Sequence, residues 1–133
     1  MGQQQLLLIV LGVIIVGIAV VVGINIFSAS AESSAKDAVV SDCTTIGAMA
    51  QQYYRKPVAM GGGSNTFDGT GSTPNGTAWS VPTKLDTTGN GVYTANVAAQ
   101  TVTITGTPLD DSYTWTVTTT VTANDITSTI VEN

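Results

Sequence analysis

The first quarter of the chain is almost entirely apolar. From Leu6 to Ile24 the sequence reads LLLIVLGVIIVGIAVVVGI, which contains no polar side chain, and the apolar character continues past Asn25 to Phe27. An α-helix rises about 1.5 Å per residue, so about 20 apolar residues cross the roughly 30 Å hydrocarbon layer of a membrane. The pattern therefore predicts that residues 1–27 form a hydrophobic helix that spans a membrane.

Two other kinds of segment fit the same hydropathy and stay open as alternatives. A secretory signal peptide has an apolar core of about 7 to 15 residues after a basic start, whereas this run is longer and the first basic residue is Lys36. The small residues 28–31 would nevertheless suit a cleavage site. An ordinary single-pass anchor has the same hydropathy. We interpret the segment as a retained helix, because the pattern that follows it is not that of a simple anchor.

A second pattern begins after Phe27. Apolar residues now recur every three or four positions, which is the spacing of one face of an α-helix, and only Gly47 interrupts it before Pro57. We therefore predict one continuous helix over about residues 3–54, in which segment 28–56 is the amphipathic continuation. Its apolar stripe needs a covering surface. The stripe consists of Ala35, Val39, Cys43, Ile46, Ala50 and Tyr53.

Glycine and proline recur through residues 57–90, and this composition predicts an irregular connecting loop. We expect one short regular piece in it, an edge strand over residues 78–81. There Trp79 and Val81 alternate with a serine, and Pro82 follows directly. A proline next to a strand is compatible with an edge position and not with a central one.

Residues 91–133 show the two-residue alternation of apolar and polar side chains that is typical of β-strands. The apolar positions form four groups, separated by residues 98–100, 107–111 and 123–125. These separators are short enough for hairpins, so the simplest topology is an antiparallel meander. The four groups are Tyr93, Ala95 and Val97; Val102 and Ile104; Tyr113, Trp115, Val117 and Val121; and Ile126 and Ile130.

The stripe on the helix and the sheet each leave one apolar face uncovered, and each supplies the burial that the other lacks. The predicted fold class is therefore α+β, with a long N-terminal α-helix packed against a four-stranded antiparallel β-sheet. In such a fold we interpret Cys43 as a small buried residue of the stripe rather than a reactive thiol.

Composition and charge exclude several classes of function. The chain has no histidine and one cysteine, which excludes imidazole metal sites, Ser-His-Asp relays and intrachain disulfides. The net charge of -5 would repel the phosphates of a nucleic acid. We therefore expect a protein that is not an enzyme, with no catalytic residue, no cofactor, no metal site and no nucleic-acid partner.

Each of three short polar motifs can be interpreted either as ordinary surface structure or as a functional site. Asn75 begins the triplet Asn-Gly-Thr, a possible glycosylation site of a very common form. Residues 86–91 are rich in oxygen ligands but lack the acidic partner of a calcium loop, which favours a tight turn. Asp110 and Asp111 precede a serine in a predicted hairpin loop, where adjacent acids usually solvate the turn rather than catalyse.

The order of these parts resembles that of type IV pilins. The start MGQQQLLLIVLGVIIVGIAVVVG in particular resembles a processed pilin N-terminus, with a hydrophobic first residue, a few polar positions and about twenty apolar ones. In that family a leader ending in glycine is removed and the new terminus is methylated, so the resemblance gives Met1 that role; an uncleaved initiator methionine is the alternative. The resemblance also implies two partners, a prepilin peptidase and a pilus assembly machinery of the inner membrane.

The sequence departs from the family pattern at several positions. Gln5 replaces the usual glutamate, and no carboxylate precedes Glu32. If that glutamate pairs in the family with the terminal amine of a neighbouring subunit, Gln5 can accept a hydrogen bond there but carries no charge. This contact between subunits is then weaker here or is replaced by a different one. The usual proline near position 22 is absent, and the single Cys43 forbids the disulfide near the carboxy terminus of many members. These departures indicate an atypical branch.

A filament also follows from physical chemistry alone. An apolar helix that leaves the bilayer needs another water-free environment, and parallel copies with the same heterologous contact provide one and grow without closing. We therefore expect a homo-oligomer, and the resemblance implies that it is the major structural subunit of an extracellular type IV pilus-like filament on the cell surface. The subunit would be stored in the cytoplasmic (inner) membrane before assembly. The expected assembly residues are Met1, Gln5, Leu6, Leu7, Val10, Ile14 and Ile18.

Two alternatives remain open at this point. A minor pilin, or a pseudopilin of a type II secretion system, would share the helix but build only a short assembly. A monomeric membrane-anchored adhesin or binding domain would keep its helix in lipid permanently.

Overall fold

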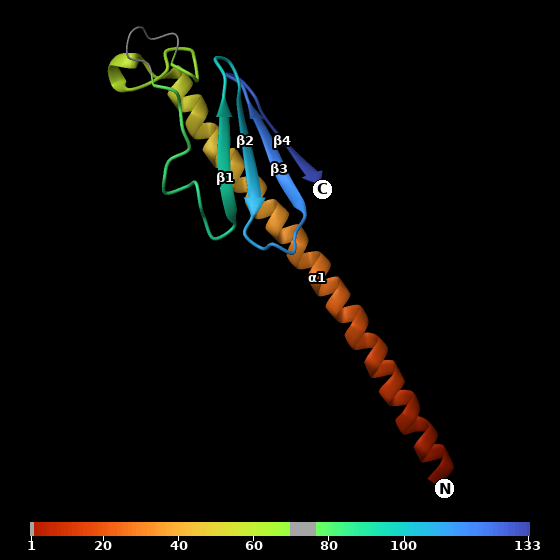
Figure 1. The fold of residues 1–133 in the computed structure, drawn as a ribbon. Coiled ribbons are helices and arrows are strands. Elements are labelled where there is room, and N and C mark those ends of the chain that lie inside the picture. Colours follow the sequence, from red (N-terminus) through yellow and green to blue (C-terminus); the bar gives the residue numbers. More distant parts are fainter. Residues whose placement is uncertain (1, 70–76) are drawn as a thin grey trace. The chain divides into compact units, whose positions relative to one another are not determined.

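The computed structural model describes residues 2–69 and 77–133. The chain divides into two compact units, Met1–Ser34 and Ala35–Asn133. One α-helix, α1, runs over Gly2–Arg55 and so contributes to both units. The long helix predicted from the sequence is thus confirmed (Figure 1).

The helix ends where the next segment supplies partners for its last carbonyl groups. Pro57 cannot donate a backbone hydrogen bond and disfavours helical geometry in the residue before it. The chain then forms a short 3-10 helix, η1, over Val58–Met60. It turns back so that the amide of Gly63 donates to the carbonyl of Tyr53 at 2.8 Å, and that of Asn65 to Tyr54 at 2.8 Å.

The second unit contains one antiparallel sheet of four strands in the order β1-β2-β3-β4, which is the predicted meander. The strands are β1 (Gly91–Val97), β2 (Val102–Pro108), β3 (Trp115–Val121) and β4 (Ile126–Glu132). Residues 35–55 of α1 pack along one face of this sheet (Figure 1). The α+β class predicted from the sequence is therefore confirmed.

The β2–β3 loop lies later in the chain than predicted. Thr107 pairs with Val92 and Pro108 with Gly91, so β2 continues to the full length of β1. The predicted separator at 107–111 was wrong, and the loop covers residues 109–114 instead. Tyr113 consequently lies before β3 and not in it.

The predicted edge strand over residues 78–81 was also wrong, because these residues form no strand. The amide of Trp79 makes a single hydrogen bond to the carbonyl of Phe67, at 2.8 Å. Both side chains are buried in the core. Tertiary burial of one aromatic residue therefore produced the apolar signal that resembled a strand.

Helix and sheet approach closely at two glycines. A Cβ atom on Gly47 would lie 2.9 Å from Cγ2 of Val121, and one on Gly106 would lie 2.7 Å from Cγ1 of Val39 and 2.9 Å from Sγ of Cys43. Such distances are shorter than real Cβ contacts. Gly47, which interrupts the sequence periodicity, is therefore a point of close contact and lies buried on the stripe.

Candidate functional site

The apolar segment of α1 is the main candidate for a functional surface. Its large apolar side chains from Leu6 to Phe27 are each between 48% and 75% exposed in this chain. They lie on all sides of the helix, and a helix that is hydrophobic all round belongs in a membrane or a protein interior. By length and composition this helix could cross a membrane.

The predicted assembly residues lie on this exposed surface. Met1 is outside the described residues. The others are all exposed: Gln5, Leu6, Leu7, Val10, Ile14 and Ile18. Gln3, Leu6, Leu7 and Val10 line a shallow apolar hollow on the helix. The segment carries no charge, so its chemistry is limited to apolar packing and to hydrogen bonds from amide side chains.

The predicted stripe lies in the core of the second unit. Its fully buried members are Val39, Cys43, Ile46 and Ala50, whereas Tyr53 is half-buried. The hydroxyl of Tyr53 donates to the carbonyl of Thr77. Burial raises the pKa of the Cys43 thiol to about 11, so this group stays protonated at neutral pH. The cysteine is therefore a packing residue and not a nucleophile.

Asp42 forms a hydrogen-bonded cluster that sequence reasoning missed. Its Oδ2 accepts hydrogen bonds from the hydroxyl of Tyr93 at 2.6 Å, from Oγ1 of Thr88 at 3.0 Å and from Nδ2 of Asn90 at 3.0 Å. Burial alone acts to raise the pKa of this carboxyl, but the three hydrogen bonds together hold the pKa below its ordinary value. Burial and the bond to Asp42 raise the pKa of Tyr93.

The Asp42 cluster fixes the loop before β1 to the helix. In the loop itself the amide of Thr88 donates to the carbonyl of Gly91 at 2.9 Å, and the amide of Asn90 donates to Oγ1 of Thr88 at 3.1 Å. These are the contacts of a tight turn, the interpretation that the sequence favours for residues 86–91. The only sequence signal for the cluster was an acid beside the apolar stripe, which local periodicity does not pair with a loop 46 residues away.

An ion pair joins the helix to β4. Nζ of Lys36 lies 2.9 Å from Oε1 of Glu132 and 5.9 Å from the centre of the Trp115 ring. The hydrogen bond and the charge of Lys36 lower the pKa of the Glu132 carboxyl. Because the Glu132 side chain is exposed, such a pair contributes little to stability.

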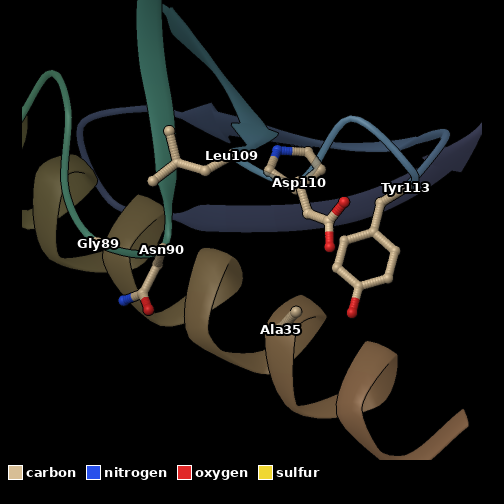
Figure 2. A pocket seen from close by; sticks show the side chains of 7 residues that line it. Ala35, Gly89, Asn90, Leu109, Asp110 and Tyr113 are labelled. Carbon is tan, nitrogen blue, oxygen red and sulfur yellow. The ribbon is translucent and has the colours of Figure 1, made fainter. Parts of the chain in front are cut away.

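A cavity of about 180 Å³ lies between α1 and the loops at one end of the sheet. Figure 2 shows Leu109, Asp110 and Tyr113 on one side of it, with Ala35 of the helix and Asn90 on the other. Oδ1 of Asp110 accepts hydrogen bonds from the amide of Ser112 at 2.9 Å and from its hydroxyl at 2.6 Å. These bonds lower the pKa of Asp110. The carboxylate therefore stabilises its own turn, as the sequence indicates for this acidic pair.

Two kinds of candidate site remain, one for a metal ion and one for a glycan. In residues 2–69 and 77–133, no group of three or more Cys, Asp or Glu side chains is placed to hold a metal ion. Asn75, the possible glycosylation site, lies outside the described residues. In the same part of the chain, Nε1 of Trp115 is a buried nitrogen without a hydrogen-bond partner.

The outward face of the sheet is a regular array of threonines. Thr94, Thr105, Thr118 and Thr129 lie opposite one another on the four successive strands. Thr103, Thr120 and Thr127 form a parallel row with Asn96. Threonine is favoured in strands and is polar without charge, so this face is hydrated but carries no electrostatic barrier against another uncharged surface.

Comparison of the chain with protein-family models, with curated proteins and with solved structures found no match.

Proposed function

We propose that this protein is the major structural subunit of an extracellular filament of the type IV pilus kind. The single observation that carries the proposal is the exposed apolar surface of α1 between Leu6 and Phe27. Water cannot solvate this surface without a large free-energy cost, at roughly 25 cal/mol per Å² of apolar area. The segment is therefore covered by lipid or by other apolar helices.

The second unit supports an assembly role rather than a catalytic one. Its core is closed by the helix stripe, and Oδ2 of the half-buried Asp42 already accepts three hydrogen bonds within the fold. The described cavity offers one carboxylate that its own turn already occupies. A unit of this kind is suited to form the outer surface of a filament and not to catalyse a reaction.

In the proposed cycle the subunit waits in the cytoplasmic membrane, with residues 6–27 in lipid. Assembly then transfers the segment to a core made of identical helices, and the second unit becomes the surface of an extracellular fibre. This transfer loses little apolar burial, because helices replace lipid. From the resemblance to type IV pilins we further propose processing by a prepilin peptidase, methylation of Met1 and extension by an inner-membrane assembly machinery.

The decisive experiment is electron microscopy of material sheared from cells that express the tagged chain. Long fibres that contain this chain would support the proposal. Fibres that are absent, with all of the chain in the membrane fraction, would instead favour a monomeric anchored adhesin. Short assemblies confined to the envelope would favour a pseudopilin or a minor pilin.

One substitution tests whether the apolar segment is the packing core. Ile14→Asp places a charge in the middle of the segment, at a cost of about 2.5 to 3.5 kcal/mol in an apolar helix environment. We expect this variant to form no fibres. Ile14→Leu is the matched control, because it keeps the volume and the apolar character, and it should assemble normally. Equal fibre yields from both variants would contradict the proposal.

A further inference from the structure

The two edges of the sheet differ in how they are protected. The first half of the outer edge of β1 is covered by the preceding loop, where Thr87 bridges to Val92 and the amide of Tyr93 donates to the carbonyl of Asp86 at 2.7 Å. At the other edge, β4 pairs with β3 alone among the described residues (Figure 1). An open edge presents a row of unpaired N–H and C=O groups, and most proteins cover or block such a row.

The β4 strand lacks the features that usually block an edge. Residues 126–131 contain no proline, glycine or lysine, and most of them are strand-forming types. The one charge of β4 is that of Glu132 at its end, where Lys36 neutralises it. Ile130 and Val131 are 40% and 41% exposed, and they lie on opposite faces of the strand. The edge is therefore suited to pair with a further strand.

Two hydrogen bonds show which backbone groups of β4 point outward. The amide of Thr122 donates to the carbonyl of Asp125 at 2.9 Å, and that of Asn133 to Thr114 at 3.1 Å. In an antiparallel ladder every second opposed pair is hydrogen-bonded. Residues 127, 129 and 131 therefore bond to β3. The N–H and C=O groups that point away from β3 are those of Ile126, Ser128, Ile130 and Glu132.

We propose that this edge pairs with the β4 edge of a second copy, antiparallel and with the two-fold axis at Thr129. In this register Ser128 lies opposite Ile130 of the other copy and Ile126 lies opposite Glu132, so that all four outward residues are bonded. A shift of two residues either way leaves one of them beyond the end of the partner strand. A shift of one residue places outward groups opposite residues that already bond to β3.

The second copy is the occupant that this geometry favours. An isologous contact needs a self-complementary surface, and Thr129, at the centre of the seven-residue strand, provides it. The loop before β1 already bonds the outward groups of Gly91 and Tyr93, so only the remainder of the β1 edge is left for the β4 strand of another copy. The proposed pairing also places the exposed Val131 against Thr127, on the uncharged threonine face.

The location of the second copy rests on the proposed function. Equivalent subunits of one polar filament all run in the same direction, and no two-fold axis relates them. A two-fold β4 contact therefore joins subunits of two neighbouring filaments. Its consequence is side-by-side association of the fibres.

Cysteine cross-linking of the full chain tests the register. Thr129 lies opposite itself in a non-hydrogen-bonded pair, where the side chains are closest. We expect Thr129→Cys fibres to give a disulfide-linked dimer on a non-reducing gel after mild oxidation. The wild type is the negative control, because its single cysteine, Cys43, is buried. Thr127→Cys is the matched control on the same face, and it should cross-link only when combined with Val131→Cys.

A second variant tests the hydrogen bonds themselves. The N–H of Ser128 points outward, so Ser128→Pro removes a donor to the partner while β4 keeps its backbone hydrogen bonds to β3, and proline is tolerated in this edge position. The substitution also removes the Ser128 hydroxyl, which lies 2.9 Å from Oγ1 of Thr119 in β3. In the Thr129→Cys background it should lower the dimer fraction about tenfold and separate the fibres, since edge pairing needs these donors. Val131→Lys, an edge block that leaves the backbone unchanged, should do the same.

The outcomes separate this inference from the proposed function. Fibres that form normally while Thr129→Cys gives no more dimer than Thr127→Cys would overturn the β4 pairing and leave the filament in place. Thr129→Cys dimers in membranes without any fibres would support the pairing and overturn the filament. Neither fibres nor dimers would overturn both.

Discussion

The two halves of α1 show how one helix geometry is adapted to two environments. In residues 6–27 apolar side chains occupy all sides of the helix and stay exposed in this chain. In residues 35–55 they occupy one stripe, and the sheet buries it. The helical backbone is the same in both halves. The pattern of apolar residues therefore decides whether a segment packs against the protein's own sheet or needs a covering from outside the chain.

The largest expected effect comes from the same substitution in both halves. Ile46 is 1% exposed and Ile14 is 53% exposed. Ile46→Ala should lower the free energy of unfolding of the second unit by about 2 to 5 kcal/mol, because it removes buried contacts and leaves a cavity. Ile14→Ala should leave that free energy unchanged.

Tryptophan fluorescence during denaturant unfolding in detergent measures this difference. The two tryptophans, Trp79 and Trp115, are both buried in the second unit and so report on it alone. Equal losses of stability from the two variants would show that the apolar segment contributes to the same cooperative core.

A smaller contrast is expected between two helical glycines. A Cβ on Gly47 would meet Val121 at 2.9 Å, whereas one on Gly17 would meet nothing within 4 Å. Gly47→Ala should destabilise the second unit by about 1 to 3 kcal/mol through overpacking. Gly17→Ala should leave the second unit unchanged and favour its own helix by up to about 1 kcal/mol. The same fluorescence assay measures the first effect, and circular dichroism the second. A stable Gly47→Ala variant would show that Val121 can move aside.

The Asp42 cluster should make the second unit less stable at low pH. A carboxyl with a lowered pKa in the folded state stabilises the fold above its unfolded pKa, near 3.8, and loses this contribution as the pH falls through the folded value. We expect the melting temperature of the wild type to fall below about pH 4 for this reason. Asp42→Asn should show a smaller fall. Parallel curves for the two proteins would exclude Asp42 as the source.

The smallest effect is expected for the exposed ion pair of β4. Glu132→Gln removes the partner of Lys36 on a side chain that is exposed to water. Such pairs are screened by salt and contribute little. The melting temperature should change less than in Asp42→Asn, and the change should vanish at high salt. A large, salt-independent loss would mean that this pair is part of the core.

Regular periodicity is a local property, and the sequence alone was sufficient to predict an element where the periodicity extended over a long run. The apolar run from Leu6, the stripe through Cys43 and the alternation after Gly91 each specify an element by the spacing of neighbouring residues. They predicted the long helix, the four strands and the α+β class. The charge, the missing histidine and the single cysteine limited the chemistry in the same way, because composition does not depend on folding.

Only the tertiary structure decided how the elements meet. The length of β2 depends on pairing with β1, and the backbone of Trp79 is bonded to the distant Phe67. The bonds of Asp42 and the open edge of β4 depend on which distant segments lie beside them. Local spacing carries no information on such contacts, because they join residues far apart in the chain, and their free energies arise only once helix and sheet have packed together.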